Sequence, residues 1–397
     1  QGVRSLMYSY KELSTSTSSF EDLRLLLSDH SYLGTIGCKD PLRPEAKEAV
    51  SIAAQAGVRT IMITGDHKLI AQNIGLELGI VKNQHQVLDG LAWEQIPEQD
   101  RSSVLKDVNV FSRVSPEQKL QIVKGMMQDG HTVIVTGDGV NDAPAIKTAD
   151  IGVAMGISGT DVAKEAADLV LQDDNYSTIV GAIKQGRGIF NNFRKFLSYQ
   201  IACNLSGVLI VFPLTILTET SPLLPVHLLL LNLISETGPC IALGLEKPEA
   251  TIMQLKPRER SEALLTKSRW FKIILEAILL AAVSIAAFFI ARHVGPTTAI
   301  SAVLTTAFLS RLWHSLNARS ETISLFSRAL RPNHGLYYTV FATLLFLFWS
   351  LYTQLGNSLT KTVPLNQSLF LTCLLLSFIP LILIELYKLG IHVTAKK

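Results

Sequence analysis

The sequence has few cysteines and almost no excess of charge of either sign. Its four cysteines lie far apart and show no metal-type spacing, which excludes a disulfide framework or a zinc site as the basis of the fold. The formal net charge is +3, so composition points neither to an acidic partner nor to nucleic acid. No signal peptide is visible, and Gln1 falls inside a strand-like run, which predicts the back part of a longer protein.

Apolar residues are abundant and unevenly distributed. They make up 48% of the 397 residues, which is enough for two or three domains. Up to about Asn192 the chain resembles a soluble protein. Beyond it come repeated apolar runs of about 20 residues, the length that crosses a bilayer. The sequence therefore predicts a membrane protein with a cytosolic-type head.

The run from His131 to Ala145 organises the head. Residues 133–135 are apolar and β-branched, as in a buried parallel strand, and a glycine-rich turn follows at once. Ligands of open α/β sheets bind at such strand ends. Asp138 and Asp142 should converge there, and two carboxylates suit Mg²⁺ beside a phosphoryl group.

The same strand-turn-helix pattern occurs earlier in the chain. A strand over 58–63 ends in Thr64-Gly65-Asp66, and a helix follows over 68–78. Strands that alternate with helices predict a parallel sheet. We also expect strands over 3–10, 33–37, 150–156 and 167–171, and a helix over 45–56.

Two further features of the head have open interpretations. Ser115 and Pro116 predict a helix start, which places Lys119 where it either reaches the strand ends or remains a solvated charge. Asp40 and Arg43 lie among two prolines, as in an interdomain hinge or in an ordinary turn before a helix.

A long helical pattern starts at Tyr176 and becomes wholly apolar after Lys195. It predicts a stalk helix that enters the membrane. Lysine and arginine fall in alternate loops, so the basic loops and the C-terminus should be cytosolic. The predicted spans are 196–217, 223–245, 270–291, 298–316, 336–355 and 368–388.

Polar residues inside these spans predict an ion site, because buried ionisable groups in a membrane are costly. Asn232, Ser235 and Glu236 have helical i, i+3, i+4 spacing and should share one face. Asn204 in the first span could add an amide oxygen to a hard-cation site. The alternative is helix–helix hydrogen bonding by the same residues.

Two more charges lie within the predicted spans. Glu276 lies close to the cytosolic end and could extend its carboxylate to the interface. Arg311 could do the same or pair with Glu236.

The motifs around these residues resemble those of P-type cation-transporting ATPases, most closely the calcium-pump-like branch. The resemblance covers essentially the whole chain. It is carried by these segments: Thr64-Gly-Asp66, Val110-Phe-Ser-Arg-Val-Ser-Pro-Glu-Gln-Lys119, Thr136-Gly-Asp-Gly-Val-Asn-Asp-Ala-Pro144, Asp161 to Asp168, Gly186-Arg-Gly-Ile-Phe-Asn-Asn192 and the second span.

The resemblance implies a haloacid-dehalogenase-like α/β fold followed by an all-α, six-helix transmembrane domain. It implies that Asp138 binds Mg²⁺, with Asn141 and Asp142 holding the same loop. Thr64 and Lys119 resemble the groups that contact phosphoryl oxygens, and Gly65 and Asp66 belong to the Thr64 turn. Asp40 and Arg43 resemble the hinge on the ATP side, although Leu42 replaces its usual second proline.

The resemblance also divides the chain into parts. Residues 1–38 end a nucleotide-binding domain, 39–175 form a phosphorylation domain, 176–195 form the stalk and 196–397 form the transmembrane domain. The family's phosphorylated aspartate lies in an Asp-Lys-Thr-Gly-Thr segment that is absent here. We therefore expect that this chain alone cannot phosphorylate itself.

The ion site departs from that of two-site calcium pumps. Gly207 stands where such pumps carry a glutamate, and Arg311 stands in place of another. A fixed cation there would repel a second ion. The expectation is a one-ion Ca²⁺ export pump of the plasma membrane.

Several alternatives remain open at this point. The pumped ion could instead be Mn²⁺, H⁺ or a monovalent cation. A non-catalytic membrane subunit or channel would keep the spans without the chemistry. A soluble phosphatase with this fold would lack the spans.

Overall fold

The computed structural model describes residues 4–12, 30–38, 41–219, 221–249, 251–321, 323–327, 330 and 332–394. Contacts divide the chain into two compact units. The first comprises 1–184 and 250–261, and we call it the head unit. The second comprises 185–249 and 262–397, and we call it the membrane unit. The loop 250–261 belongs to the head unit, although it lies between two predicted spans.

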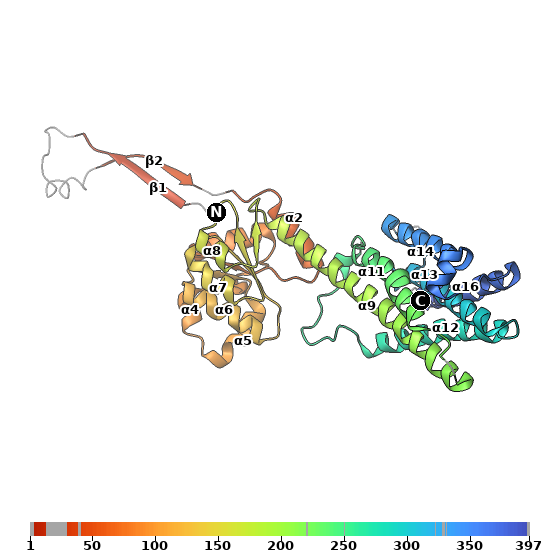
Figure 1. The fold of residues 1–397 in the computed structure, drawn as a ribbon. Coiled ribbons are helices and arrows are strands. Elements are labelled where there is room, and N and C mark those ends of the chain that lie inside the picture. The colour runs from red at the N-terminus through yellow and green to blue at the C-terminus, as the bar shows by residue number, and fades with distance from the viewer. Residues whose placement is uncertain are drawn as a thin grey trace. The chain divides into compact units, whose positions relative to one another are not determined.

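The head unit begins with a two-stranded antiparallel hairpin of β1 (Arg4–Tyr10) and β2 (Ser31–Cys38). Both strands are drawn as long arrows in Figure 1. Both were expected from the sequence. Most of their apolar side chains are exposed, including Met7 and Leu33.

Two parallel sheets form the rest of the head unit. One has the strand order β3-β5-β4, with β3 at Met62–Ile63, β4 at Val87–Asp89 and β5 at Val110–Ser112. The other has the order β6-β7-β8, with β6 at Ile134–Gly137, β7 at Ile151–Met155 and β8 at Leu169–Leu171. In the described residues, β3 and β6 each pair with a strand on one side only.

Short helices connect these strands: α2 (Ala46–Gln55), α3 (Lys68–Leu78), α4 (Gly90–Glu94), α5 (Glu98–Asp107), α6 (Pro116–Gln128), α7 (Ala143–Thr148) and α8 (Asp161–Ala166). The predicted start of α6 is confirmed: Ser115 Oγ accepts from the Gln118 amide, and Gln118 Oε1 accepts from the Ser115 amide. This reciprocal cap satisfies two amides that the helix cannot pair by itself. Parallel strands joined by helices confirm the predicted α/β fold.

The loop 250–261 packs onto the head unit. Ile252 begins a short 3-10 helix and is buried, and Met253 packs against the α2 core. Arg260 Nη2 donates to Asp150 Oδ1 at 2.8 Å. Asp150 Oδ2 in turn accepts from the Val133 amide at 2.9 Å. The sequence pattern gave no sign of this docking.

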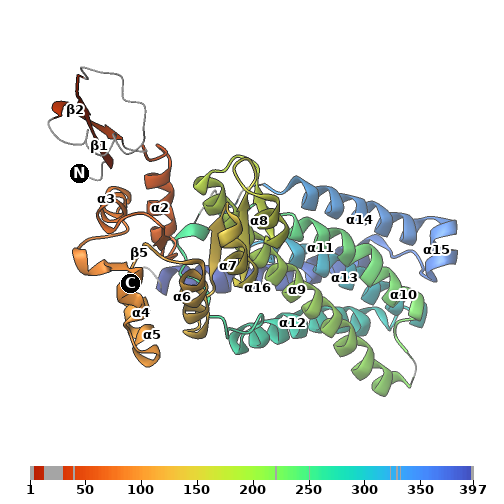
Figure 2. The ribbon, with the colours of Figure 1, turned by 90° about the vertical axis from the view of Figure 1, so that its left-hand side faces the viewer.

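The membrane unit is helical, and the unit boundary falls within α9 (Tyr176–Thr218). The other helices are α10 (Pro225–Leu230), α11 (Thr237–Gly244), α12 (Lys267–Ala291), α13 (Pro296–Asn317), α14 (His334–Tyr352), α15 (Gln354–Thr360) and α16 (Gln367–Thr394). Figure 2 shows α11 to α14 and α16 running beside one another.

Among the described residues, five helices are long and apolar enough to cross a membrane: α9, the continuous segment 225–244, α12, α14 and α16. They coincide with five of the six predicted spans. The sixth, α13, has 22 residues but carries polar groups such as Thr305, Ser310 and Arg311. These side chains are buried, because α13 lies among α11, α12, α14 and α16.

Candidate functional site

Asp142 is the centre of the hydrogen-bonding network that follows β6. Its Oδ1 accepts a charge-assisted bond from Lys119 Nζ at 2.7 Å. Its Oδ2 accepts from the backbone amides of Asp138 at 3.3 Å and Gly139 at 3.4 Å. A Cβ on Gly137 would lie 2.4 Å from Asp142 Cβ. The turn therefore folds tightly around this carboxylate, and glycine is required at 137.

Asp138 and Asn141 lie on the outside of the same turn. Both residues are exposed. The Asp138 carbonyl accepts from the Thr160 amide at 2.8 Å, which fixes the backbone. Within the described part of the chain, no hydrogen bond or ion pair engages the Asp138 carboxylate. It is therefore available to a ligand, whereas the Asp142 carboxylate is already engaged.

The turn after β3 is held by its own side chains. Thr64 Oγ1 donates to Asp66 Oδ2 and accepts from the Asp66 amide, both at 3.1 Å. Gly65 between them is exposed. In the described ranges, no hydrogen bond joins this group to Asp138 or Asp142. Arg43 is exposed, and Asp40 lies outside the described residues.

The carboxylates of the β6 turn are few. Across the residues described, no group of three or more His, Cys, Asp or Glu side chains could hold a metal ion. Mg²⁺ is usually bound in proteins by one or two carboxylates together with substrate phosphates and water. The donor set of Asp138 and Asp142 fits that pattern rather than a closed metal cage.

The second predicted span is interrupted by a wide turn. Residues Leu231–Glu236 form a π-helix between α10 and α11, a form often found at functional sites. Ser235 and Glu236 are buried, but Asn232 is exposed. Burial therefore does not follow the predicted common face at Asn232. Ser235 Oγ donates to the Leu231 carbonyl at 2.7 Å.

Glu236 is bound by an arginine inside the membrane unit. Arg311 Nη1 donates to Glu236 Oε1 at 2.5 Å, and both side chains are 2% exposed. Arg311 Nη2 also donates to the Cys203 carbonyl at 2.8 Å and to Ser206 Oγ at 3.4 Å. Of the two predicted fates of Arg311, pairing with Glu236 is confirmed.

Comparison with known proteins covers both units. Residues 220–390 match the family model for the C-terminus of cation-transporting ATPases, and residues 4–150 match a haloacid dehalogenase-like hydrolase model. The calcium-transporting ATPase of Bacillus subtilis is 38% identical over 401 residues. Calcium-transporting ATPase 1 of Saccharomyces cerevisiae is 36% identical over 395 residues.

The chain belongs to the P-type cation-transporting ATPases, on the calcium-pump-like branch. The alignments cover 100% and 98% of the chain but only 44% and 41% of those two relatives. The chain thus spans less than half the length of the curated relatives it matches. Because the chain belongs to this family, its membrane unit is part of an integral membrane protein.

Several groups around the pair of Glu236 and Arg311 were not singled out from the sequence. Cys203 and Ser206 hold the Arg311 guanidinium, and Tyr199 Oη donates to the Arg311 carbonyl at 3.3 Å. A Cβ on Gly207 would lie 3.3 Å from Arg311 Nη2, so glycine leaves room for the guanidinium. A backbone carbonyl carries no residue-type signal. Asn204 itself is exposed.

Proposed function

We propose that this chain is part of an ATP-driven cation pump in which Glu236 binds the transported ion. Ca²⁺ is the favoured ion, with about one ion per cycle. The observation that carries this proposal is the buried Glu236 carboxylate at a π-turn, paired with Arg311. Relatives named calcium-transporting ATPases support the choice of ion. The cell membrane is the proposed location.

The arginine argues for one ion rather than two. A cation of any kind must share the Glu236 carboxylate with the guanidinium or displace it. The interaction of two charges scales inversely with their separation and is strong where water is excluded. A second divalent ion beside the Arg311 guanidinium would therefore be repelled. Ser235 and the exposed Asn232 and Asn204 are the proposed oxygen donors that complete the site.

The head unit supplies part of a phosphoryl-transfer site in this proposal. Asp138 would hold Mg²⁺ directly, because its carboxylate is exposed and unengaged. Asp142 would hold the loop and orient Lys119 toward phosphoryl oxygens. The bound ion would supply neutralisation of the charge that develops on the transferred group.

Two further groups complete the proposed head site. Thr64, within the turn that includes Gly65 and Asp66, would donate to phosphoryl oxygens, and Asn141 would support the magnesium loop. Asp40 and Arg43 are proposed to serve the ATP side.

Transport by the full-length protein tests the proposed function. Vesicles that contain the purified pump should take up radioactive calcium when ATP and Mg²⁺ are added, and Glu236→Gln should abolish that uptake. Uptake of Mn²⁺ in place of calcium would change the ion but keep the site. ATP-driven movement of only H⁺ or a monovalent ion, or no ATP-driven transport at all, would contradict the proposal.

The magnesium assignment has its own test. In the full-length pump, Asp138→Asn should raise the Mg²⁺ concentration that half-maximal phosphoenzyme formation requires by about tenfold or more, because it removes the free anionic ligand. Asp100→Asn is the matched control, since Asp100 is exposed on the first turn of α5. An unchanged magnesium requirement in Asp138→Asn would remove this residue from the site.

A further inference from the structure

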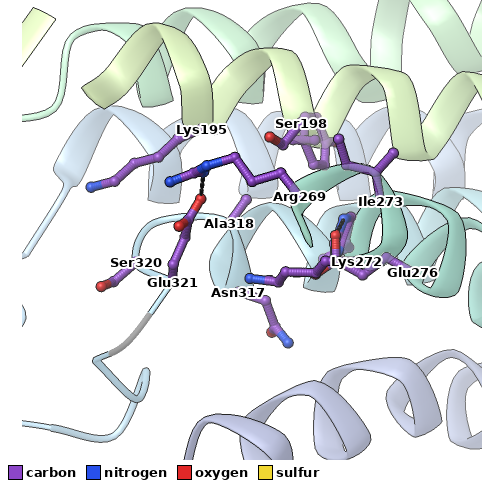
Figure 3. A pocket seen from close by; sticks show the side chains of 12 residues that line it. Lys195, Ser198, Arg269, Lys272, Ile273, Glu276, Asn317, Ala318, Ser320 and Glu321 are labelled. Carbon is purple, nitrogen blue, oxygen red and sulfur yellow. Dashed lines mark hydrogen bonds and ion pairs between the residues drawn. The ribbon is translucent and has the colours of Figure 1, made fainter. Parts of the chain in front are cut away.

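A second polar site lies in the membrane unit, in a pocket lined from α9, α12 and α13. Its empty space amounts to about 390 Å³, part of which is open to solvent. Figure 3 shows its side chains, with Lys272, Glu276 and Asn317 close together. None of these residues belongs to the proposed ion site. The pocket lies where α12 begins and α13 ends.

Buried polar atoms without partners face this pocket. His314 and Asn317 are each 2% exposed. Within the part of the chain described, both ring nitrogens of His314, Oδ1 of Asn317 and Oγ of Ser198 have no hydrogen-bond partner. Buried polar groups in folded proteins are nearly always satisfied, by ordered water where protein groups are missing. Ordered water in the pocket would satisfy these atoms, those of the imidazole included.

A carboxylate lies beside that imidazole. Glu276 Oε2 is 3.7 Å from His314 Nε2, and Glu276 is 7% exposed. The prediction that Glu276 extends to the interface is therefore wrong. The 3.7 Å separation is too long for a hydrogen bond, but it is short enough for the charge of each group to change the proton affinity of the other. Neutral imidazole offers an acceptor nitrogen, and a protonated carboxyl group offers a donor.

The other charges that face the pair are accounted for by their own partners. Lys195 Nζ lies 2.8 Å from Glu249 Oε1, and Arg269 pairs with Glu321. Lys388 Nζ lies 2.7 Å from Glu385 Oε1 and also donates to the Asn317 carbonyl. Arg311, on the same helix as His314, is bound to Glu236. The ring of Tyr199 lies against His314, with centroids 5.5 Å apart.

Among the described residues that line the pocket, Lys272 is the remaining cation beside the pair. Its Nζ lies 3.8 Å from Glu276 Oε1, one helical turn away on α12. The Lys272 ammonium repels a metal cation from the carboxylate, and the Glu276 carboxylate repels an anion. A proton satisfies both constraints, because it needs only the carboxylate, the imidazole and water.

We propose that Glu276 and His314 form a proton-binding site of the membrane unit, filled from solvent through this pocket. One proton moves from water to the pair when the pH falls and returns to water when it rises. The two groups titrate as a unit, and Lys272 sets their proton affinity by repulsion. This inference does not depend on which ion the pump carries.

Nuclear magnetic resonance of the 397-residue chain in lipid nanodiscs tests the proposal. Histidine is labelled with ¹⁵N, and the signal that disappears in His314→Gln is assigned to His314. Its shifts should change with pH in a single step, because the two groups titrate together. In Glu276→Gln this change should be lost, whereas the signals of exposed His293 should match those of the unchanged chain. Shifts of His314 that ignore pH, or that respond equally in Glu276→Gln, would overturn the proposal.

A second variant separates titration from misfolding. Lys272→Gln removes the repelling charge, so the His314 midpoint should move to higher pH by about one unit, a tenfold gain in proton affinity. Damage to the fold would not raise the affinity of the pair. A midpoint that stays in place or moves to lower pH would contradict the proposal. Because no transport is measured, a failed pump and a failed proton site are told apart.

Discussion

The ion pair of Glu236 and Arg311 is the most consequential interaction at the scale of single residues. A buried pair lacks the solvation of two exposed charges, and removing one partner leaves the other charge uncompensated. Arg311 has other acceptors in the Cys203 carbonyl and Ser206 Oγ. Glu236 has no second charged partner among the residues described.

A double-mutant cycle tests this coupling. Arg311→Met should lower the free energy of unfolding by about 3–5 kcal/mol, because the Glu236 carboxylate is then buried without a partner. Glu236→Gln should cost less, since the guanidinium keeps two other acceptors. The double variant should be more stable than the sum of the single effects predicts. The measurement is thermal unfolding of the chain in detergent, and simple additivity would contradict the pairing.

The sequence predicted the positions of the candidate site residues in the fold better than their contacts. Spacing and motif placed Glu236, Lys119 and Asp142 at strand ends or within a span. The sequence could not show that Lys119 already binds Asp142, because that contact joins two helices far apart in the chain. The sequence also gave no sign that Asn232 is exposed while Ser235 and Glu236 are buried.

At the scale of elements, the docked loop 250–261 packs closely against Gly57 of the head unit. Gly57 has φ +72°, and a Cβ there would lie 2.5 Å from Pro257 Cδ. Gly79 has φ +79° with nothing within 4 Å of a Cβ. The two glycines therefore separate backbone strain from the contact with the loop.

Alanine at each position measures that difference. Gly79→Ala should cost about 1–2 kcal/mol, the penalty for a left-handed residue with a Cβ. Gly57→Ala should cost a further 1–3 kcal/mol or so, from overpacking against Pro257. Limited proteolysis should then cut the 250–261 loop faster in Gly57→Ala only. Equal losses in the two variants, with equal proteolysis, would mean that the loop does not dock there.

The carboxylate of Asp174 fixes the end of β7. The backbone amides of Ile157, Ser158 and Gly156 donate to the Asp174 carboxylate at 3.0, 2.8 and 2.7 Å. These hydrogen bonds, of which the one from the Ile157 amide has the largest effect, hold the pKa of Asp174 at about 2, below its usual value of 3.8. Bonds to backbone amides favour the charged form.

The sign of the pH effect follows from that lowered pKa. The contribution of Asp174 to stability is complete above the unfolded pKa and is lost as pH falls from about 4 through about 2. Asp174→Asn should lower the melting temperature at neutral pH and leave a smaller further loss on acidification. Asparagine also tolerates the φ of +49° at this position. If the melting temperatures of both proteins fell in parallel between about pH 4 and about pH 2, the carboxylate would make no such contribution.

Elements were the easiest level to predict from the sequence. Helix α3 and the start of α9 match their predicted bounds, and the predicted strands agree within a few residues, but β4 and β5 were not predicted. Strands β3 and β8 are shorter than expected, because only part of each predicted run pairs with a neighbouring strand. The docking of 250–261 was missed, since its contacts with α2 and Asp150 are long-range and leave no periodic pattern.

At the scale of the whole molecule, the proposed magnesium-dependent phosphate site belongs to the head unit and the proposed ion site belongs to the membrane unit. Both belong to one cation-transporting ATPase chain that spans less than half the length of its relatives. In the part of the chain described, β3 and β6 have unpaired edges. We expect that this chain without the rest of the pump forms no acid-stable phosphoenzyme from ATP, because it contains no Asp-Lys-Thr-Gly-Thr segment.

The ratio of bound calcium to phosphoenzyme in the full-length pump tests the central claim most directly. Radioactive calcium and radioactive phosphate from ATP are counted in the same purified sample, with Glu236→Gln beside it. One ion site at Glu236 predicts about one calcium per phosphoenzyme, and no calcium-dependent phosphoenzyme in the variant. A ratio near two, or unchanged calcium dependence in Glu236→Gln, would contradict the account.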